Sequence, residues 1–189
     1  MNDAIRADVI ENELRGWISI LSGQKHESDR GVAIVIASIF DERITSLLKL
    51  ALPHTPFEEK IFQEMSRQDG PLGTFKSKTD LFFLLGMINE VQYRSVNLIR
   101  KIRNQFAHSA HLIKFSNPEI EDICRNLKYY EIAKRDPRMT FIMTSAFLFM
   151  ELSEKLYGDN GVSPIDVEKM YQDISDEIQK STDIKVARA

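Results

Sequence analysis

One stretch of the sequence, NEVQYRSVNLIRKIRNQFAHSAH at residues 89–111, constrains the fold more than any other. Its apolar residues recur at the spacing of one buried stripe on an α-helix, and they are Leu98, Ile99, Ile102 and Phe106. Asn89 precedes the stripe and offers a side-chain acceptor to the first free amides of a helix. The pattern predicts a single amphipathic helix over residues 89–111.

The polar face of this helix carries the candidate functional residues. Arg100, Asn104, His108 and His111 follow at steps of four, four and three residues, so their side chains share one side of the helix. Arg103 lies outside that row, because five residues at about 100° each place it roughly 140° from His108. Arg103 and His108 can therefore share a site only if the helix ends before His108 or two copies of the helix meet.

The rest of the chain is typical of a helical bundle. No stretch alternates apolar and polar residues for long enough to need a β-strand, and the 189 residues include only 8 Gly and 6 Pro. Pro, Gly and capping residues separate the helix-spaced segments. They divide the chain into an N-terminal helix at 1–26, a core helical domain at 27–157 and a C-terminal helix at 163–181 that packs on the body or on a partner. The sequence predicts an all-α single bundle of about seven helices.

Composition bears on several functional classes. The single cysteine, Cys124, cannot form an intrachain disulfide and indicates a reducing cytoplasm. The longest apolar runs, at 31–40 and 141–150, are too short to span a bilayer, so no membrane association is expected. His108 and His111 have no acidic or cysteine ligand beside them at helical spacing, so we expect no metal site and no cofactor.

Two polar segments elsewhere have a plain structural interpretation. Asp41, Glu42 and Arg43 interrupt an apolar helix, and we interpret them as helix-surface charge, with a polar intrusion that faces a site as the alternative. The segment DGPLGTF at 69–75 lacks the GxxxxGK[ST] spacing of a phosphate-binding loop. It predicts a tight turn.

The segments GPLGTF at 70–75 and LIRKIRNQFAHS at 98–109 resemble the mannitol operon repressor family of bacteria. The likeness runs from about residue 30 to about residue 150, and it implies a cytoplasmic negative regulator of a sugar-alcohol operon. That family lacks a recognised DNA-reading motif, and this chain has a net charge of −3 and no basic recognition helix, so direct DNA binding is not expected. The resemblance implies repression through a partner, another protein regulator or an enzyme, with the acidic last helix as a candidate contact surface.

The Arg-Asn-x-x-x-His pattern of residues 103–108 is also similar to the HEPN superfamily of helical bundles, many of which are metal-independent ribonucleases. This likeness implies a homodimer that cleaves RNA, in which Arg103 holds the phosphate, Asn104 orients it or a partner, and His108 moves protons. Arg100 and His111 are the further binding residues. Two alternatives remain for the three motif residues: a structural role, in which they bond helix-end carbonyls or a neighbouring chain, and the binding of a ligand or an anion. The sequence leaves open whether the protein is an enzyme.

Overall fold

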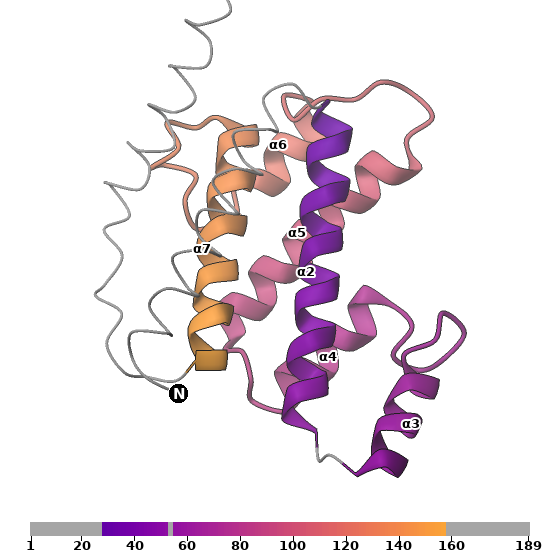
Figure 1. Ribbon diagram of the computed structural model, residues 1–189. Coiled ribbons are helices and arrows are strands. Elements are labelled where there is room, and N and C mark those ends of the chain that lie inside the picture. The colour runs from indigo at the N-terminus through magenta and orange to yellow at the C-terminus, as the bar shows by residue number, and fades with distance from the viewer. Residues whose placement is uncertain (1–27, 53–54, 158–189) are drawn as a thin grey trace, which may run out of the picture.

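The computed structural model describes residues 28–52 and 55–157, which form six α-helices and no β-strand (Figure 1). These helices are α2 (Asp29–Ala51), α3 (Pro56–Met65), α4 (Phe75–Leu84), α5 (Glu90–His108), α6 (Pro118–Cys124) and α7 (Pro137–Tyr157). The predicted all-α class is confirmed, and six described helices agree with an expectation of about seven. The helices predicted at 1–26 and 163–181 lie outside the described residues.

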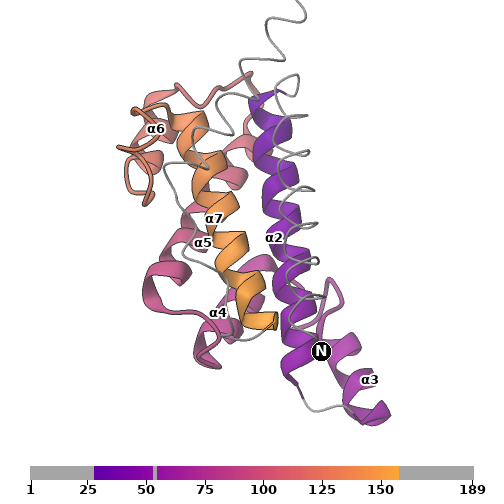
Figure 2. The same cartoon turned by 60° about the vertical axis from the view of Figure 1, so that its left-hand side comes forward.

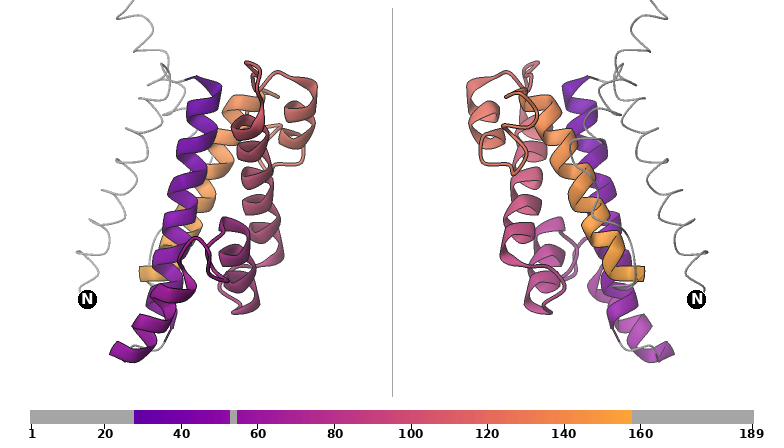
Figure 3. Two further views of the ribbon diagram at one scale, coloured as in Figure 1. Left: turned by 90° about the vertical axis from the view of Figure 1, so that its right-hand side faces the viewer. Right: turned by 90° about the vertical axis from the view of Figure 1, so that its left-hand side faces the viewer.

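Helices α2, α5 and α7 pack on one another and form the body of the bundle, in which α5 crosses obliquely behind α2 in the view of Figure 1 (Figures 1 and 3). Helix α4 packs on α2 and α5 at one end of this body, and α6 packs on α5 and α7 at the other.

All ten residues of α7 from 141 to 150 are buried. The buried residues of α2 are Val32, Ala33, Ile36, Ala37, Phe40, Ile44, Leu47 and Leu48. A helix that is apolar on every side lies inside the core, so composition alone places α7 there.

Helix α5 begins where the sequence predicts and ends three residues earlier. The Asn89 side chain accepts a hydrogen bond from the backbone N–H of Gln92 at 2.9 Å, and the Gln92 side chain accepts one from the N–H of Asn89 at 3.0 Å. Ser109 is extended and ends the helix. The Arg30 guanidinium donates to the carbonyl oxygens of Ser109 and His111 at 2.7 and 3.1 Å. The prediction of a helix through His111 was therefore wrong, because a distant arginine binds these carbonyls.

Aromatic packing and one ion pair fix the loop that follows α5. Phe115 lies between Phe106 and Phe141, with ring centroids 4.9 and 5.2 Å apart. The backbone N–H of Phe115 donates to the Asp29 carboxylate at 2.8 Å, and Asp29 also pairs with Arg138 of α7. The loop is thereby joined to three helices, and it holds the end of α5 in place.

Candidate functional site

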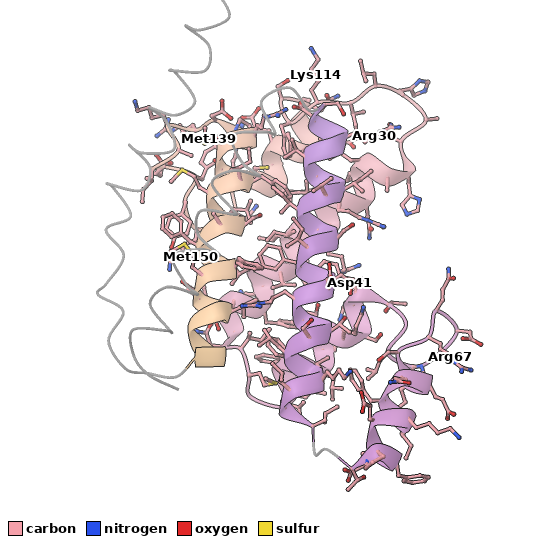
Figure 4. All side chains as sticks on the ribbon, viewed as in Figure 1. Arg30, Asp41, Arg67, Lys114, Met139 and Met150 are labelled. Atoms are coloured by element: carbon pink, nitrogen blue, oxygen red, sulfur yellow. The ribbon has the colours of Figure 1, made fainter. Side chains whose placement is uncertain are left out.

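A polar cavity of about 300 Å³ opens between α2, the start of α4 and α5. Helix α2 contributes Ala37, Ser38 and Asp41; the turn and α4 contribute Gly73, Thr74, Phe75 and Lys76; α5 contributes Arg100, Arg103 and Asn104. Figure 4 shows Asp41 midway along α2. Three of the candidate residues from the sequence, Arg100, Arg103 and Asn104, therefore meet in one cavity.

The turn before α4 reaches this cavity because two of its residues are glycines. The N–H of Gly70 donates to the carbonyl of Arg67 and that of Leu72 to the carbonyl of Met65, each at 2.8 Å. A Cβ on Gly70 would lie 2.3 Å from the Met65 oxygen, and one on Gly73 would lie 2.2 Å from the Arg67 oxygen. Only glycine permits so close an approach of two backbone segments. The segment forms the tight turn that its sequence predicts.

An ion pair holds the carboxylate of Asp41 at the wall of the cavity. Lys78 of α4 is buried, pairs with Asp41, and donates to the Thr45 hydroxyl at 3.0 Å. A buried ammonium needs such partners, because its desolvation is costly. The interpretation of Asp41 as helix-surface charge was wrong, since Lys78, which is 37 residues further along the chain, draws this carboxylate to the inner side of α2.

A second group of charges lies at the start of α4. Lys76 pairs with Asp80, and the Tyr93 hydroxyl donates to Asp80 at 2.8 Å. Burial alone would raise the pKa of Asp80, but the hydrogen bonds from Lys76 and Tyr93 and the charges of Lys76 and Arg100 lower it below its usual value. The hydrogen bond to Asp80 raises the pKa of Lys76. Both groups are charged at neutral pH, and they offset each other.

Arg100 and Arg103 have no carboxylate partner among the residues that the structure describes. Arg103 donates to the side-chain oxygen of Asn104 at 3.1 Å, which is a neutral acceptor. The Nε of Arg100 is buried and has no hydrogen-bond partner in the described chain. An unsatisfied buried donor costs about 1–3 kcal/mol. Arg100 acts on Asp80 through its charge, but Asp80 already pairs with Lys76. Cationic side chains therefore outnumber carboxylates around the cavity, and an anion is the ligand that such a cavity favours.

The two histidines lie away from this cavity. His108 is exposed at the end of α5 and lines a separate cavity of about 460 Å³ beside the start of α6. His111 is exposed in the loop beyond α5, so it does not extend the polar row of the helix as predicted. Helix α5 continues through His108, and one chain does not place His108 and Arg103 in the same cavity. A site that uses both requires a second copy of the chain.

Other reactive groups are few in the described chain. No cluster of three or more His, Cys, Asp or Glu side chains there is arranged to hold a metal ion. Cys124 is buried, and this burial raises the pKa of its thiol to about 12. None of the helices within residues 28–52 and 55–157 is long and apolar enough to cross a bilayer.

An exposed apolar surface lies on α3, far from the cavity wall formed by α5. Phe57 and Ile61, one turn apart, are 72% and 40% exposed, and we call them the α3 surface. A separate groove of about 630 Å³ lies between α3 and the end of α2, where Leu50, Leu52 and Phe62 are among the residues that line it. Figure 2 shows α3 projecting beyond the end of α2. Exposed apolar side chains that gather in this way mark contact surfaces for proteins.

Sequence reasoning did not single out Lys76 of the cavity, and it gave a site-facing role for Asp41 only as the alternative to helix-surface charge. Their helical spacing gives no sign of a site, because each is an ordinary polar position on its own helix. A signal was available in the two segments that carry the family likeness, 70–75 and 98–109. They are far apart in the sequence, and the fold brings them to the same cavity.

Comparisons with known proteins agree with this architecture. The family model of the mannitol repressor matches residues 24–159. Among solved structures, the chain is similar to one described as "X-ray structure of the MtlR-HPr complex from Escherichia coli", with a TM-score of 0.56 and 17% sequence identity over 73% of this chain and 99% of that one. No curated protein matches the chain. Because the family match covers well over half of its length, the chain belongs to the mannitol repressor family.

Proposed function

We propose that this protein represses a sugar-alcohol operon by binding a protein partner, without reading DNA itself. The observation that carries the proposal is its membership of the mannitol repressor family. Its fold is shared with a protein whose structure was solved in a complex with HPr, and we propose that the HPr of its own organism is the partner here. The net charge of −3 supports this proposal, because a protein that binds DNA through its phosphates carries an excess of positive charge on the contact face.

The α3 surface is the part of the described chain that best fits such a partner. Phe57 is an exposed aromatic side chain, and aromatic anchors dominate the energetics of protein interfaces. Ile61, one turn further along the helix, extends this apolar surface, and the core of a protein interface is usually apolar. The acidic helix predicted at 163–181, outside the described residues, remains a second candidate surface.

A reporter gene placed under the operon's promoter tests this function in cells that lack the chain. Restoring the wild-type protein should lower reporter expression, and the double variant Phe57→Ser/Ile61→Ser should fail to do so while accumulating to the same level. Leu112→Ser is the matched control, because Leu112 is 84% exposed in a loop and should repress as the wild type does. Reporter expression that does not respond to the wild-type protein would overturn the proposal.

Two further expectations accompany this function. The protein acts in the cytoplasm, since an operon is transcribed there. A homodimer remains a prediction, which sedimentation of the full chain tests. A mass of twice 21.8 kDa supports the dimer, and a mass of 21.8 kDa contradicts it.

A further inference from the structure

We propose that the cavity between α2, α4 and α5 binds a phosphate dianion, either free phosphate or the phosphate monoester of a small polyol, through Arg100 and Arg103. This site goes beyond the proposed function, because it is a small-molecule site separate from the α3 surface. It would give the regulator an effector.

The charge balance of the cavity indicates a dianion. Its lining includes three cations and one carboxylate. Lys76 is offset by Asp80, and the carboxylate of Asp41 is offset by Lys78. Arg100 and Arg103 form no ion pair in the described part of the chain. Although Arg100 also acts on Asp80 through its charge, the four cations of this group outnumber the two carboxylates by two. Two guanidinium groups together balance a ligand with two negative charges, which a phosphate monoester carries near neutral pH.

The donors converge on one space. Arg100 and Arg103 are three residues apart on α5, so both side chains reach the same side of the helix. The bond from Arg103 to the Asn104 oxygen at 3.1 Å orients both side chains at the cavity wall. It leaves the Asn104 amide nitrogen as a further donor. Guanidinium groups bind phosphate oxygens through paired N–H donors, and such charge-assisted bonds are stronger than those between neutral groups.

The start of α4 adds a second set of donors on the opposite wall. The first backbone hydrogen bond of this helix joins the N–H of Lys78 to the Thr74 carbonyl at 3.1 Å. The N–H groups of Phe75 and Lys76 lie before that bond, at the start of the helix. Both residues line the cavity. The first amides of a ten-residue helix point out of its positive end and favour an anion. Gly73 lets the backbone lie close at this wall.

The size of the cavity limits the ligand. Its volume of about 300 Å³ equals that of roughly ten water molecules, which leaves room for a phosphate group and a short carbon chain. A neutral polyol would leave both guanidinium charges without a counter-charge. The phosphate group is therefore the required part of the ligand, and the polyol portion is the variable one.

Isothermal titration of the full chain with inorganic phosphate and with glycerol 1-phosphate, at matched ionic strength in chloride, tests the proposal. Mannitol serves as the neutral ligand. Wild-type protein should bind at least one phosphate compound saturably, at one site per chain, and should not bind mannitol. Similar affinities for both compounds assign free phosphate as the ligand, and an affinity about tenfold higher for glycerol 1-phosphate assigns a polyol ester.

Two variants and one control locate the site. Arg100→Gln and Arg103→Gln should each weaken binding by about tenfold or more, the loss expected for a charge-assisted hydrogen bond. Lys101→Gln should change it less than about twofold, because Lys101 is exposed on the same helix and does not line the cavity. Circular dichroism confirms that each variant is folded, and Arg100→Lys, which keeps the charge, should recover part of the affinity.

Several results would overturn the proposal. They are no binding of either phosphate compound by the wild type, an equal loss in Lys101→Gln and Arg100→Gln, or binding of mannitol that both arginine variants retain. Binding of an oligonucleotide that depends on Arg100 and Arg103, with no binding of phosphate, would also overturn it. The titration contains no HPr, so its failure leaves the proposed function untouched.

Discussion

Arg100 and Arg103 line one cavity from the same helix, and neither forms an ion pair with a carboxylate in the described chain. Another arginine of the same helix is paired, since Arg94 binds Glu90 four residues before it. Arg100 and Arg103 carry like charges three residues apart on one helix, and such charges repel each other. Two of the positive charges of α5 therefore lie together at the cavity, where a ligand can offset them.

The turn that forms the cavity wall should depend on Gly73. Gly73→Ala should lower the free energy of unfolding by about 1–3 kcal/mol, because the added Cβ would meet the Arg67 carbonyl oxygen at 2.2 Å and the turn must shift. Urea denaturation measures the free energy of unfolding of the variant and of the wild type. Gly86→Ala is the comparison, since Gly86 has φ 70° but open space around it, and should cost about 1–2 kcal/mol without altering the cavity. A Gly73→Ala protein as stable as the wild type would contradict this account of the turn.

The first residues of two helices should differ in their contribution to stability. Asp29 begins α2, its side chain is 19% exposed, and it binds both Arg138 and the Phe115 N–H. Asp29→Ala should therefore cost about 1–3 kcal/mol of unfolding free energy. Glu90 begins α5 and forms only an exposed pair with Arg94, so Glu90→Ala should cost less than about 1 kcal/mol. Equal costs in thermal unfolding would show that the Asp29 contacts do not hold the loop after α5.

Stability should fall in acid partly through Asp80. Its pKa in the folded protein lies below the ordinary value of 3.8, so its ionised form stabilises the fold above that value. This contribution is lost as the pH falls through the lowered pKa and the carboxyl binds a proton. The free energy of unfolding, measured in urea from neutral pH to acid, should decrease less steeply for Asp80→Asn than for the wild type below about pH 4. Parallel curves would exclude a contribution from Asp80.

The ribonuclease alternative makes a separate prediction. Because Arg103 and His108 line different cavities of one chain, we expect that a single chain does not cleave single-stranded RNA in the absence of metal, and that cleavage requires a dimer. A gel assay at high protein concentration measures this for the wild type, Arg103→Ala and His108→Ala. Cleavage by the wild type that both variants lose, with their folds intact, would establish the enzyme and require that two copies of α5 meet.

The sequence predicted the local features of α5 and not its surroundings. The Asn89 cap and the buried positions Ile99, Ile102 and Phe106 depend on neighbours along the chain, and the structure confirms them. The end of α5 depends on Arg30, about 80 residues away, and no local pattern records that contact. The same limit applies to the cavity, whose walls come from three helices.

A cavity of this kind follows from tertiary packing. Arg103 and Asn104 were recognised as candidates from their motif, and the structure places both in the cavity. A site-facing role for Asp41 was only the alternative, because its partner, Lys78, lies on another helix and no local pattern indicates that contact. His108 belongs to the same motif but lies elsewhere, since the helix continues through it and turns its side chain away from that cavity. The HEPN likeness remains a prediction.

Titration calorimetry of the full chain with the HPr of its own organism tests the central claim, that this protein acts by binding another protein. Saturable binding is expected, with an affinity that Phe57→Ser/Ile61→Ser lowers by about tenfold or more and Leu112→Ser leaves unchanged. The absence of HPr binding, together with tight binding of operator DNA by the chain alone, would contradict it.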